Sequence, residues 1–435
     1  MLDFKIELLN PLHTYFPGQN IEGRIIISLD KPKTMSSLKI ELRGDGRVHW
    51  TESKTVTRDG KSETETIHRR SHESYLAMDT ILFNGPELGA GFHVFPFNLF
   101  LPTNLPSSFE GQHGSIRYYV QGVVVRSWKW NHRVKKHFTL NSIVDLNMYQ
   151  GCNHPGESRD SKTFCCLCCR SGPLCALIMT DRSGYVPGES IIFTAEVDNQ
   201  SSKEMTNSTV QLVEKVTFKA GGHTRSTSRI IAEQQRGRIG PGDSDLWNKV
   251  AMYVPGLPPS NLGGSCNIIQ LQYILQLVVH PSGVGFALTV SLPITIGTIP
   301  LQEYMNQFSY NSGIGTAPPP PPAIYNSDPT QNQPGAIRFY APGSDINAPP
   351  PYPPVGYNPS AYPPSASAPP GAYPPGASAP PLPTSFSAYS NLPPPSYASS
   401  VWGEVNVKAD DDDEHTRGDF KFVPQYPTYN VIKPY

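Results

Sequence analysis

The chain has 435 residues, which is enough for two or three domains that each bury a core. Its 35 basic and 36 acidic residues nearly cancel, so net charge gives no reason to expect nucleic-acid binding. The N-terminal run MLDFKIELLN contains charged residues, and no uncharged apolar run of about 18 residues occurs, so we expect neither a signal peptide nor a membrane-spanning helix.

The chain has seven cysteines, an odd number that cannot all pair, and five of them lie between Cys152 and Cys169. This usage argues against a secreted disulfide framework. We therefore expect a soluble cytoplasmic protein with reduced thiols.

The first 150 residues alternate apolar and polar side chains with the two-residue period of half-buried strands. Residues 51–70 have no periodic apolar face, and we expect them to form a long mobile hairpin or loop. The pattern predicts strands at residues 2–8, 21–29, 38–42, 75–83, 116–125 and 138–146.

The same rhythm returns later in the chain and predicts strands at residues 191–197, 210–218, 269–279 and 286–296. No stretch has the apolar stripe of a helix. The sequence thus predicts an all-β protein of two antiparallel β-sandwich domains. We place the first domain at residues 1–150, a cysteine-rich connection at 151–172 and the second domain at 173–300.

Two segments of the first domain have near copies in the second. The turn Tyr15–Gly23, YFPGQNIEG, resembles Tyr185–Phe193, YVPGESIIF, and Ile116–Val124, IRYYVQGVV, aligns with Leu271–Val279, LQYILQLVV, without a gap. One shared Pro-Gly turn would carry little weight. Two matched pairs in the same order indicate tandem copies of one domain.

The composition changes from Pro300 onward, where about 30 of the 46 prolines lie among Ser, Ala, Gly and Tyr. Such a segment has too few aliphatic residues to bury a core. We expect residues 301–435 to form a disordered tail.

The paired YFPGQNIEG and YVPGESIIF turns, the RSGP stretch at Arg170–Pro173 and the proline-rich tail together resemble the arrestin-domain-containing proteins, the α-arrestins. The likeness spans residues 1 to about 300. It implies an arrestin fold of two sandwiches joined in a shallow saddle, and an adaptor that brings HECT-type ubiquitin ligases to membrane cargo. The acidic tail signatures by which visual and β-arrestins bind clathrin are absent from the sequence.

Two PPxY motifs stand in the tail. A WW domain binds such a motif because consecutive prolines hold the polyproline II shape and present the tyrosine to a second pocket. About 0.6 matches are expected by chance in so biased a segment, so two matches behind this body favour real WW ligands. The predicted WW-binding residues are Pro349, Pro350, Pro351 and Tyr352 in the first motif and Pro394, Pro395, Ser396 and Tyr397 in the second.

The cysteine cluster CCLCC consists of Cys165, Cys166, Cys168 and Cys169. Its two overlapping C-x-x-C spacings allow a zinc site, but adjacent cysteines on an extended chain point in opposite directions. We weigh three interpretations: thiols without chemistry, which we favour, then palmitoylation, then zinc binding. Cys266 lies where some α-arrestins have a cysteine used in thioredoxin binding, and here we expect it to be buried in a strand.

Six basic residues lie in or beside strands of the first domain, where an arrestin-like body would meet phosphorylated or acidic cargo tails. A solvated face is the interpretation that we favour for this set, and we also expect the acidic run Asp410–Glu414 to be solvated. The candidate cargo-binding residues are Arg117, Arg126, Lys129, Arg133, Lys135 and Lys136.

No catalytic motif occurs: the sequence has no G-x-S-x-G, H-E-x-x-H, P-loop or G-x-G-x-x-G. We expect a non-enzymatic adaptor without cofactor or metal, peripheral at the plasma membrane and endosomes. Its expected partners are WW-domain HECT ubiquitin ligases and the cytoplasmic tails of membrane receptors or transporters. The alternatives are a ligase-independent trafficking scaffold, resembling the arrestin-like subunit of retromer, and, less favoured, an ESCRT recruiter.

Overall fold

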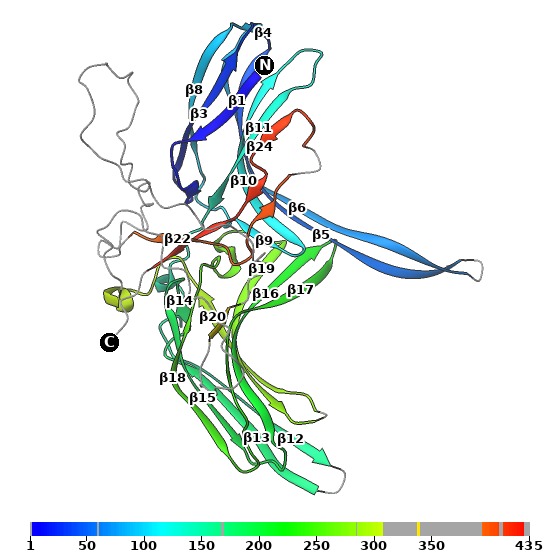
Figure 1. Ribbon diagram of the computed structural model, residues 1–435, viewed down its shortest axis with the longest axis vertical. Coiled ribbons are helices and arrows are strands. Elements are labelled where there is room, and N and C mark those ends of the chain that lie inside the picture. Colours follow the sequence, from blue (N-terminus) through cyan, green and yellow to red (C-terminus); the bar gives the residue numbers. More distant parts are fainter. Residues whose placement is uncertain are drawn as a thin grey trace, which may run out of the picture.

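The computed structural model describes residues 2–58, 61–166, 169–283, 285–307, 337–339, 394–408 and 412–429. Two β-sandwiches lie end to end in an elongated molecule (Figure 1). The described residues contain no α-helix, only three short 3-10 turns, η1 (Leu146–Met148), η2 (Ser260–Gly263) and η3 (Gln302–Gln307). Two tandem sandwiches are therefore confirmed.

The first domain packs a three-stranded sheet against a larger one, with apolar residues of both lining the core. The small sheet has the order β1 (Leu2–Leu8), β3 (Asn20–Leu29), β8 (Gly91–Phe100). The large sheet has the order β2 (Thr14–Tyr15), β11 (His132–Leu140), β10 (Gly114–Val125), β5 (Ser37–Arg58), β6 (Lys61–Asn84), and β9 (Phe109–Gly111) also pairs with β10. The short strands β4 (Lys33–Thr34) and β7 (Glu87–Leu88) pair with each other.

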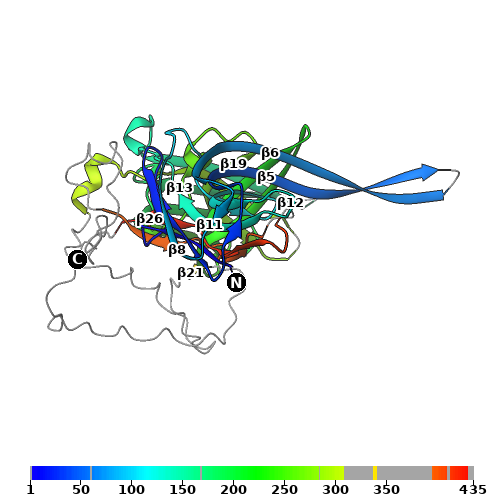
Figure 2. The ribbon, with the colours of Figure 1, turned by 90° about the horizontal axis from the view of Figure 1, so that it is seen from above.

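The β5–β6 hairpin projects far beyond the sandwich (Figure 2). Its pairing runs from Ser37↔Asn84 to Arg58↔Lys61. Outside the sandwich most of its side chains are exposed on both faces, which explains why residues 51–70 show no apolar period. The segment expected as a hairpin or loop is a hairpin.

The second domain repeats this plan with one four-stranded and one six-stranded sheet. The first has the order β12 (Gly156–Cys166), β13 (Cys169–Thr180), β15 (Ser190–Asn199), β18 (Ser244–Tyr253). The second has the order β14 (Gly184–Tyr185), β20 (Leu288–Ile296), β19 (Ile269–Pro281), β16 (Met205–Ala220), β17 (His223–Arg236), β21 (Ile337–Phe339).

The second domain differs from the sequence-based expectation in two places. The segment expected as a connection, residues 151–172, contains β12 and the start of β13, so most of it belongs to the second sandwich. β17 and β18 were not predicted, because their exposed stretches hide the two-residue period. The sheets are also mixed, since β2–β11 and β14–β20 pair in parallel.

The duplicated segments occupy equivalent places in the two domains. The N–H of Phe16 donates to Gln19 Oε1 at 2.8 Å, and that of Val186 donates to Glu189 Oε2 at 2.8 Å. Each repeated tyrosine also anchors a proline-rich loop. Tyr118 donates to the Pro106 carbonyl at 2.7 Å, and Tyr273 donates to the Pro258 carbonyl at 2.8 Å.

Residues 394–408 and 412–429, here called the C-terminal segment, differ from the expected disordered tail because they pack on both domains. Their strands are β22 (Ser396–Ser399), β23 (Val405–Asn406), β24 (Thr416–Gly418), β25 (Lys421–Phe422) and β26 (Gln425–Thr428). Tyr426 and Tyr429 are fully or almost fully buried, and Phe422 is 8% exposed. These aromatic residues supply the apolar area that the proline-rich stretch lacks.

Candidate functional site

A buried apolar cluster lies where the domains meet, and it brings the two Pro-Gly turns together. We call it the interdomain cluster; it consists of Phe16, Leu146, Cys152, Val186, Ile299, Leu301, Met305 and Tyr429. Tyr429 comes from the C-terminal segment, and its hydroxyl donates to the Thr298 carbonyl at 2.8 Å. The C-terminal segment therefore covers the joint between the domains.

Gly188 of the second Pro-Gly turn admits this close approach. Its φ is +98°, and a Cβ there would lie 1.9 Å from the carbonyl oxygen of Tyr429. A glycine is required both by the backbone conformation and by the space.

The second PPxY motif is part of this arrangement. Pro395 is buried, and Tyr397 is half-buried against the interdomain cluster, where burial raises the pKa of its hydroxyl. Strand β22 pairs antiparallel with β26, and the hydroxyls of Ser396 and Thr428 are 2.9 Å apart. Ser396 and Tyr397 of the motif are therefore held in a strand against the body. The first motif, Pro349–Tyr352, lies outside the described residues.

Two described residues of the acidic run, Asp412 and Asp413, lie against the predicted basic strand of the first domain. β24 adds in parallel to the edge of β11, placing Lys135 opposite Gly418. Lys135 forms an ion pair with Asp412 in which the two side chains are only 5% and 2% exposed, and Arg133 lies 3.7 Å from Asp413. The expectation that this run is solvated is wrong for Asp412, because Lys135 binds it in a buried setting.

Gly418 permits the pairing with β11. Its φ is +147°, and a Cβ would lie 2.4 Å from the carbonyl oxygen of Lys135. The Nζ of Lys135 also lies 4.9 Å from the centre of the Tyr119 ring, which adds a cation–π contact.

The structure does not bring all six basic residues to one surface. Arg117 binds Glu110 through two hydrogen bonds of 2.7 and 2.9 Å, and Glu110 is buried, so this pair serves the core. Arg126 donates from Nε to the Trp130 carbonyl at 2.8 Å, and Lys129 is exposed in the β10–β11 loop.

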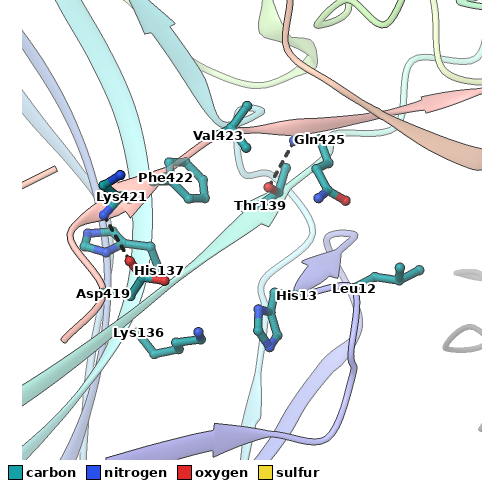
Figure 3. Close-up of a pocket in the computed structure, with 10 residues that line it drawn as sticks. All are labelled: Leu12, His13, Lys136, His137, Thr139, Asp419, Lys421, Phe422, Val423 and Gln425. Carbon is teal, nitrogen blue, oxygen red and sulfur yellow. Dashed lines mark hydrogen bonds between the residues drawn. The ribbon is translucent and has the colours of Figure 1, made fainter. Parts of the chain in front are cut away.

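Lys136 lines a small cleft of about 150 Å³ between β11 and the C-terminal segment (Figure 3). Asp419 and Phe422 form the side contributed by the C-terminal segment, and the N–H of Gln425 donates to Thr139 Oγ1 at 3.2 Å. His137 also lines it; burial, together with Arg117 and Lys135, lowers its pKa to about 4. The cleft is shallow and polar, which suits contact with a peptide better than enclosure of a cofactor.

A second anchor ties the C-terminal segment to the second domain. The Trp402 ring stacks 3.9 Å from the Arg229 guanidinium carbon, and its Nε1 donates to Glu214 Oε1 at 3.1 Å. Both partners come from the β16–β17 hairpin. The C-terminal segment thus contacts both domains and their joint.

The cysteine cluster lies at the tip of the β12–β13 hairpin, where Cys166 pairs with Cys169. This tip is at the end of the second domain farthest from the first (Figure 1). Cys168 and the side chains of Cys165, Cys166 and Cys169 lie outside what the structure describes. The side chains that it does describe contain no group of three or more metal-ligating residues.

Cys266 is half-buried just before β19, not in a strand. The Tyr75 hydroxyl of β6 donates to its Sγ at 3.1 Å, and burial raises the pKa of the thiol. It therefore lies at a contact between the domains.

Family comparisons agree with the two-domain structure. The model described as arrestin (or S-antigen), N-terminal domain, matches residues 4–147, and the model for the C-terminal domain matches residues 170–301. The chain belongs to the arrestin-domain-containing proteins, the α-arrestins. Proteins of this family are non-enzymatic adaptors or scaffolds, and this α-arrestin is an arrestin-like trafficking adaptor.

Several relatives align over most of both chains. Arrestin domain-containing protein 17 of Caenorhabditis elegans is 33% identical over 72% of this α-arrestin and 76% of the relative. Human arrestin domain-containing protein 4 is 30% identical over 69% and 72%, and human arrestin domain-containing protein 1 is 28% identical over 76% and 72%. No helix in the described part of this α-arrestin is long and apolar enough to cross a membrane.

Sequence reasoning missed the aromatic residues that anchor the C-terminal segment, notably Trp402, Tyr426 and Tyr429. A signal was present, since the run FKFVPQYPTY at residues 420–429 is far richer in large aromatics than the Pro, Ala and Ser stretch before it. Treating the whole tail as one composition hid that change.

Proposed function

We propose that this α-arrestin links membrane cargo, such as receptors or transporters, to WW-domain HECT-type ubiquitin ligases. The arrestin body binds the cargo tail and the PPxY motifs bind the ligase, so cargo is ubiquitinated by proximity and enters endocytosis and endosomal sorting. The protein then acts at the plasma membrane and endosomes. Two PPxY motifs behind an arrestin body support the ligase arm.

One observation carries the cargo arm: an acidic peptide segment is bound on β11, with Asp412 against Lys135. An acidic or phosphorylated cargo tail offers the same backbone edge and stronger negative charge. Such a tail would compete with residues 412–418 for β11. Of the predicted basic set, Lys135 and Arg133 are the residues that we expect to contact the cargo tail.

The two PPxY motifs then have different roles. A WW domain must contact the prolines and tyrosine of its ligand in the polyproline II shape. Tyr397 and Pro395 are held by the body, so the motif at 394–397 requires release of β22 before it binds. The motif at 349–352 supplies the initial contact, and the second adds avidity once β22 is released.

The ligase arm is tested by affinity purification of the full chain with and without Tyr352→Ala and Tyr397→Ala. We expect HECT ligases to be lost from the double variant while membrane cargo is retained. If no ligase is lost, the ligase arm is wrong, and the ligase-independent trafficking scaffold takes its place.

The cargo arm is tested with a phosphorylated acidic peptide and the full chain. Asp412→Asn with Asp413→Asn should strengthen peptide binding because it weakens the competitor, whereas Lys135→Gln should weaken it. Lys54→Gln, an exposed residue of the long hairpin, is the matched control. Equal affinity of the wild type, the Asp412→Asn, Asp413→Asn variant and the Lys135→Gln variant would show that β11 does not bind cargo.

A further inference from the structure

Two of the five tryptophans are exposed together in the loop between β10 and β11. Trp128 is fully exposed and has a positive φ of 61°, and Trp130 is 72% exposed. Trp50 and Trp247, by contrast, are almost completely buried. Two large exposed rings in one loop bury little apolar area in this chain, so they do not contribute to folding as core tryptophans do.

The loop is held in a defined shape. The N–H of Arg126 donates to Asn131 Oδ1 at 3.0 Å, and the Arg126 guanidinium donates to the Trp130 carbonyl. Ser127 Oγ lies 2.9 Å from Ser36 Oγ, which joins the loop to the neighbouring β4 region. Hydrogen bonds therefore hold the loop in the conformation that exposes both tryptophans to solvent.

Cationic groups lie in the same loop as these tryptophans and on the neighbouring β4. Lys33 on β4 donates to His132 Nε2 at 3.0 Å, and Arg126 and the exposed Lys129 lie in the loop itself. Burial, followed by Arg126, Arg417 and Lys129, lowers the pKa of Lys33. Within the described ranges no carboxylate forms an ion pair with Lys33, Arg126 or Lys129.

The position of this surface also matters. Figure 1 shows β4 at the end of the first domain farthest from the second, and the hydrogen bonds of Ser36 and Lys33 place the loop beside it. This end can meet a flat surface without hindrance from the second domain. His415, just before β24, lies beside the loop, with its ring centroid 6.5 Å from that of Trp130.

We propose that the β10–β11 loop and β4 form a site that docks on the surface of an anionic lipid bilayer. Trp128 and Trp130 enter the interfacial zone, where tryptophan is most favourable, and Lys33, Arg126 and Lys129 contact lipid phosphates. Exposed tryptophans favour a bilayer over a soluble anion, because a soluble anion would leave the rings in water. The site would hold the adaptor at the membrane, where a cargo tail would compete with residues 412–418 for β11.

Flotation of the full chain with phosphatidylcholine vesicles, with or without phosphatidylserine, tests this site. We expect binding only with phosphatidylserine, and weaker binding as ionic strength rises. Trp128→Ala with Trp130→Ala should reduce binding roughly tenfold. Lys33→Gln with Lys129→Gln should reduce it about fivefold per charge.

Two controls match these changes. Phe286→Ala removes an aromatic residue that is 86% exposed in the second domain, and Lys54→Gln removes an exposed charge from the long hairpin. Both should bind like the wild type, and circular dichroism should show that every variant is folded. Brominated lipid should quench the tryptophan emission of the wild type. It should not quench the emission of the three tryptophans that remain in the Trp128→Ala, Trp130→Ala variant.

Three results would overturn the proposal. Wild-type vesicle binding by the tryptophan variant would remove the loop from the membrane contact. Equal competition by soluble inositol phosphate and by vesicles would show a site for the anion alone. If the tryptophan variant bound vesicles like the wild type but lost a protein partner, the loop would be a protein interface.

Discussion

The backbone N–H of Tyr429 donates a 2.9 Å hydrogen bond to the carbonyl oxygen of Pro187, in the Pro-Gly turn of the second domain. This contact closes the C-terminal segment over the joint where both repeated turns meet. The same segment holds the second PPxY motif and the acidic residues that occupy β11. Under the proposed function, ligase binding and cargo binding are coupled through this one element, and its release is the first quantity to measure.

Gly418→Val should release β24 from β11, because the new side chain would collide with the Lys135 carbonyl and its φ of +147° is unfavourable for valine. Hydrogen exchange should rise sharply for residues 412–429 and little in the core strands of either domain. Gly237→Ala, with nothing within 4 Å of the added Cβ, is the control. Unchanged exchange in the Gly418→Val variant would show that β24 does not depend on this close approach.

Release should also expose the motif at Tyr397. With an isolated WW domain, Tyr397→Ala should change binding to the intact chain by less than about twofold, because the tyrosine is already withdrawn. In the Gly418→Val background the same substitution should cause a larger loss. Titration calorimetry of the four proteins checks this, and equal losses in both backgrounds would show that the motif is accessible from the start.

Stability should fall as the solution is acidified through the range set by His137. Its folded pKa is about 4, whereas an unfolded histidine titrates near about 6.5, so the unfolded chain takes up the proton first. The stabilisation is complete above about pH 6.5 and is lost as pH falls towards 4. His137→Gln should therefore show a smaller decrease in Tm between pH 7.5 and 5 than the wild type, and equal decreases would contradict the assignment.

The two Pro-Gly turns should differ in their sensitivity to mutation. Glu189 accepts hydrogen bonds from the Val186 N–H and from Arg182, which is 3% exposed, whereas Gln19 plays the first role in the other turn without a buried charge. Glu189→Ala leaves a buried guanidinium uncompensated and should cost about 3–5 kcal/mol. Gln19→Ala should cost about 1–3 kcal/mol. Urea unfolding compares them, and equal costs would mean that Arg182 finds another partner.

The sequence alone was sufficient for the elements whose signal is local. Apolar and polar side chains alternate along strands such as β1, β10 and β19, because one face of each strand is buried and the other is not. The local sequence is therefore enough to predict them. The repeated Pro-Gly turns likewise identified the duplication, because each depends on the backbone freedom of a glycine and on the side chain four residues after the repeated tyrosine, Gln19 or Glu189. Family and architecture followed from these local features.

Only the tertiary structure decided the state of the C-terminal segment. Asn141 Nδ2 donates to the Gln425 carbonyl at 2.9 Å across 284 positions of the chain, and Lys135 binds Asp412 over a similar distance in sequence. Neither local sequence predicts the other as its partner, because water can solvate an acidic run and a basic strand separately. Their pairing depends on β11 offering an unpaired edge at the place where Tyr426 and Tyr429 can be buried, and that coincidence exists only once both sandwiches have formed.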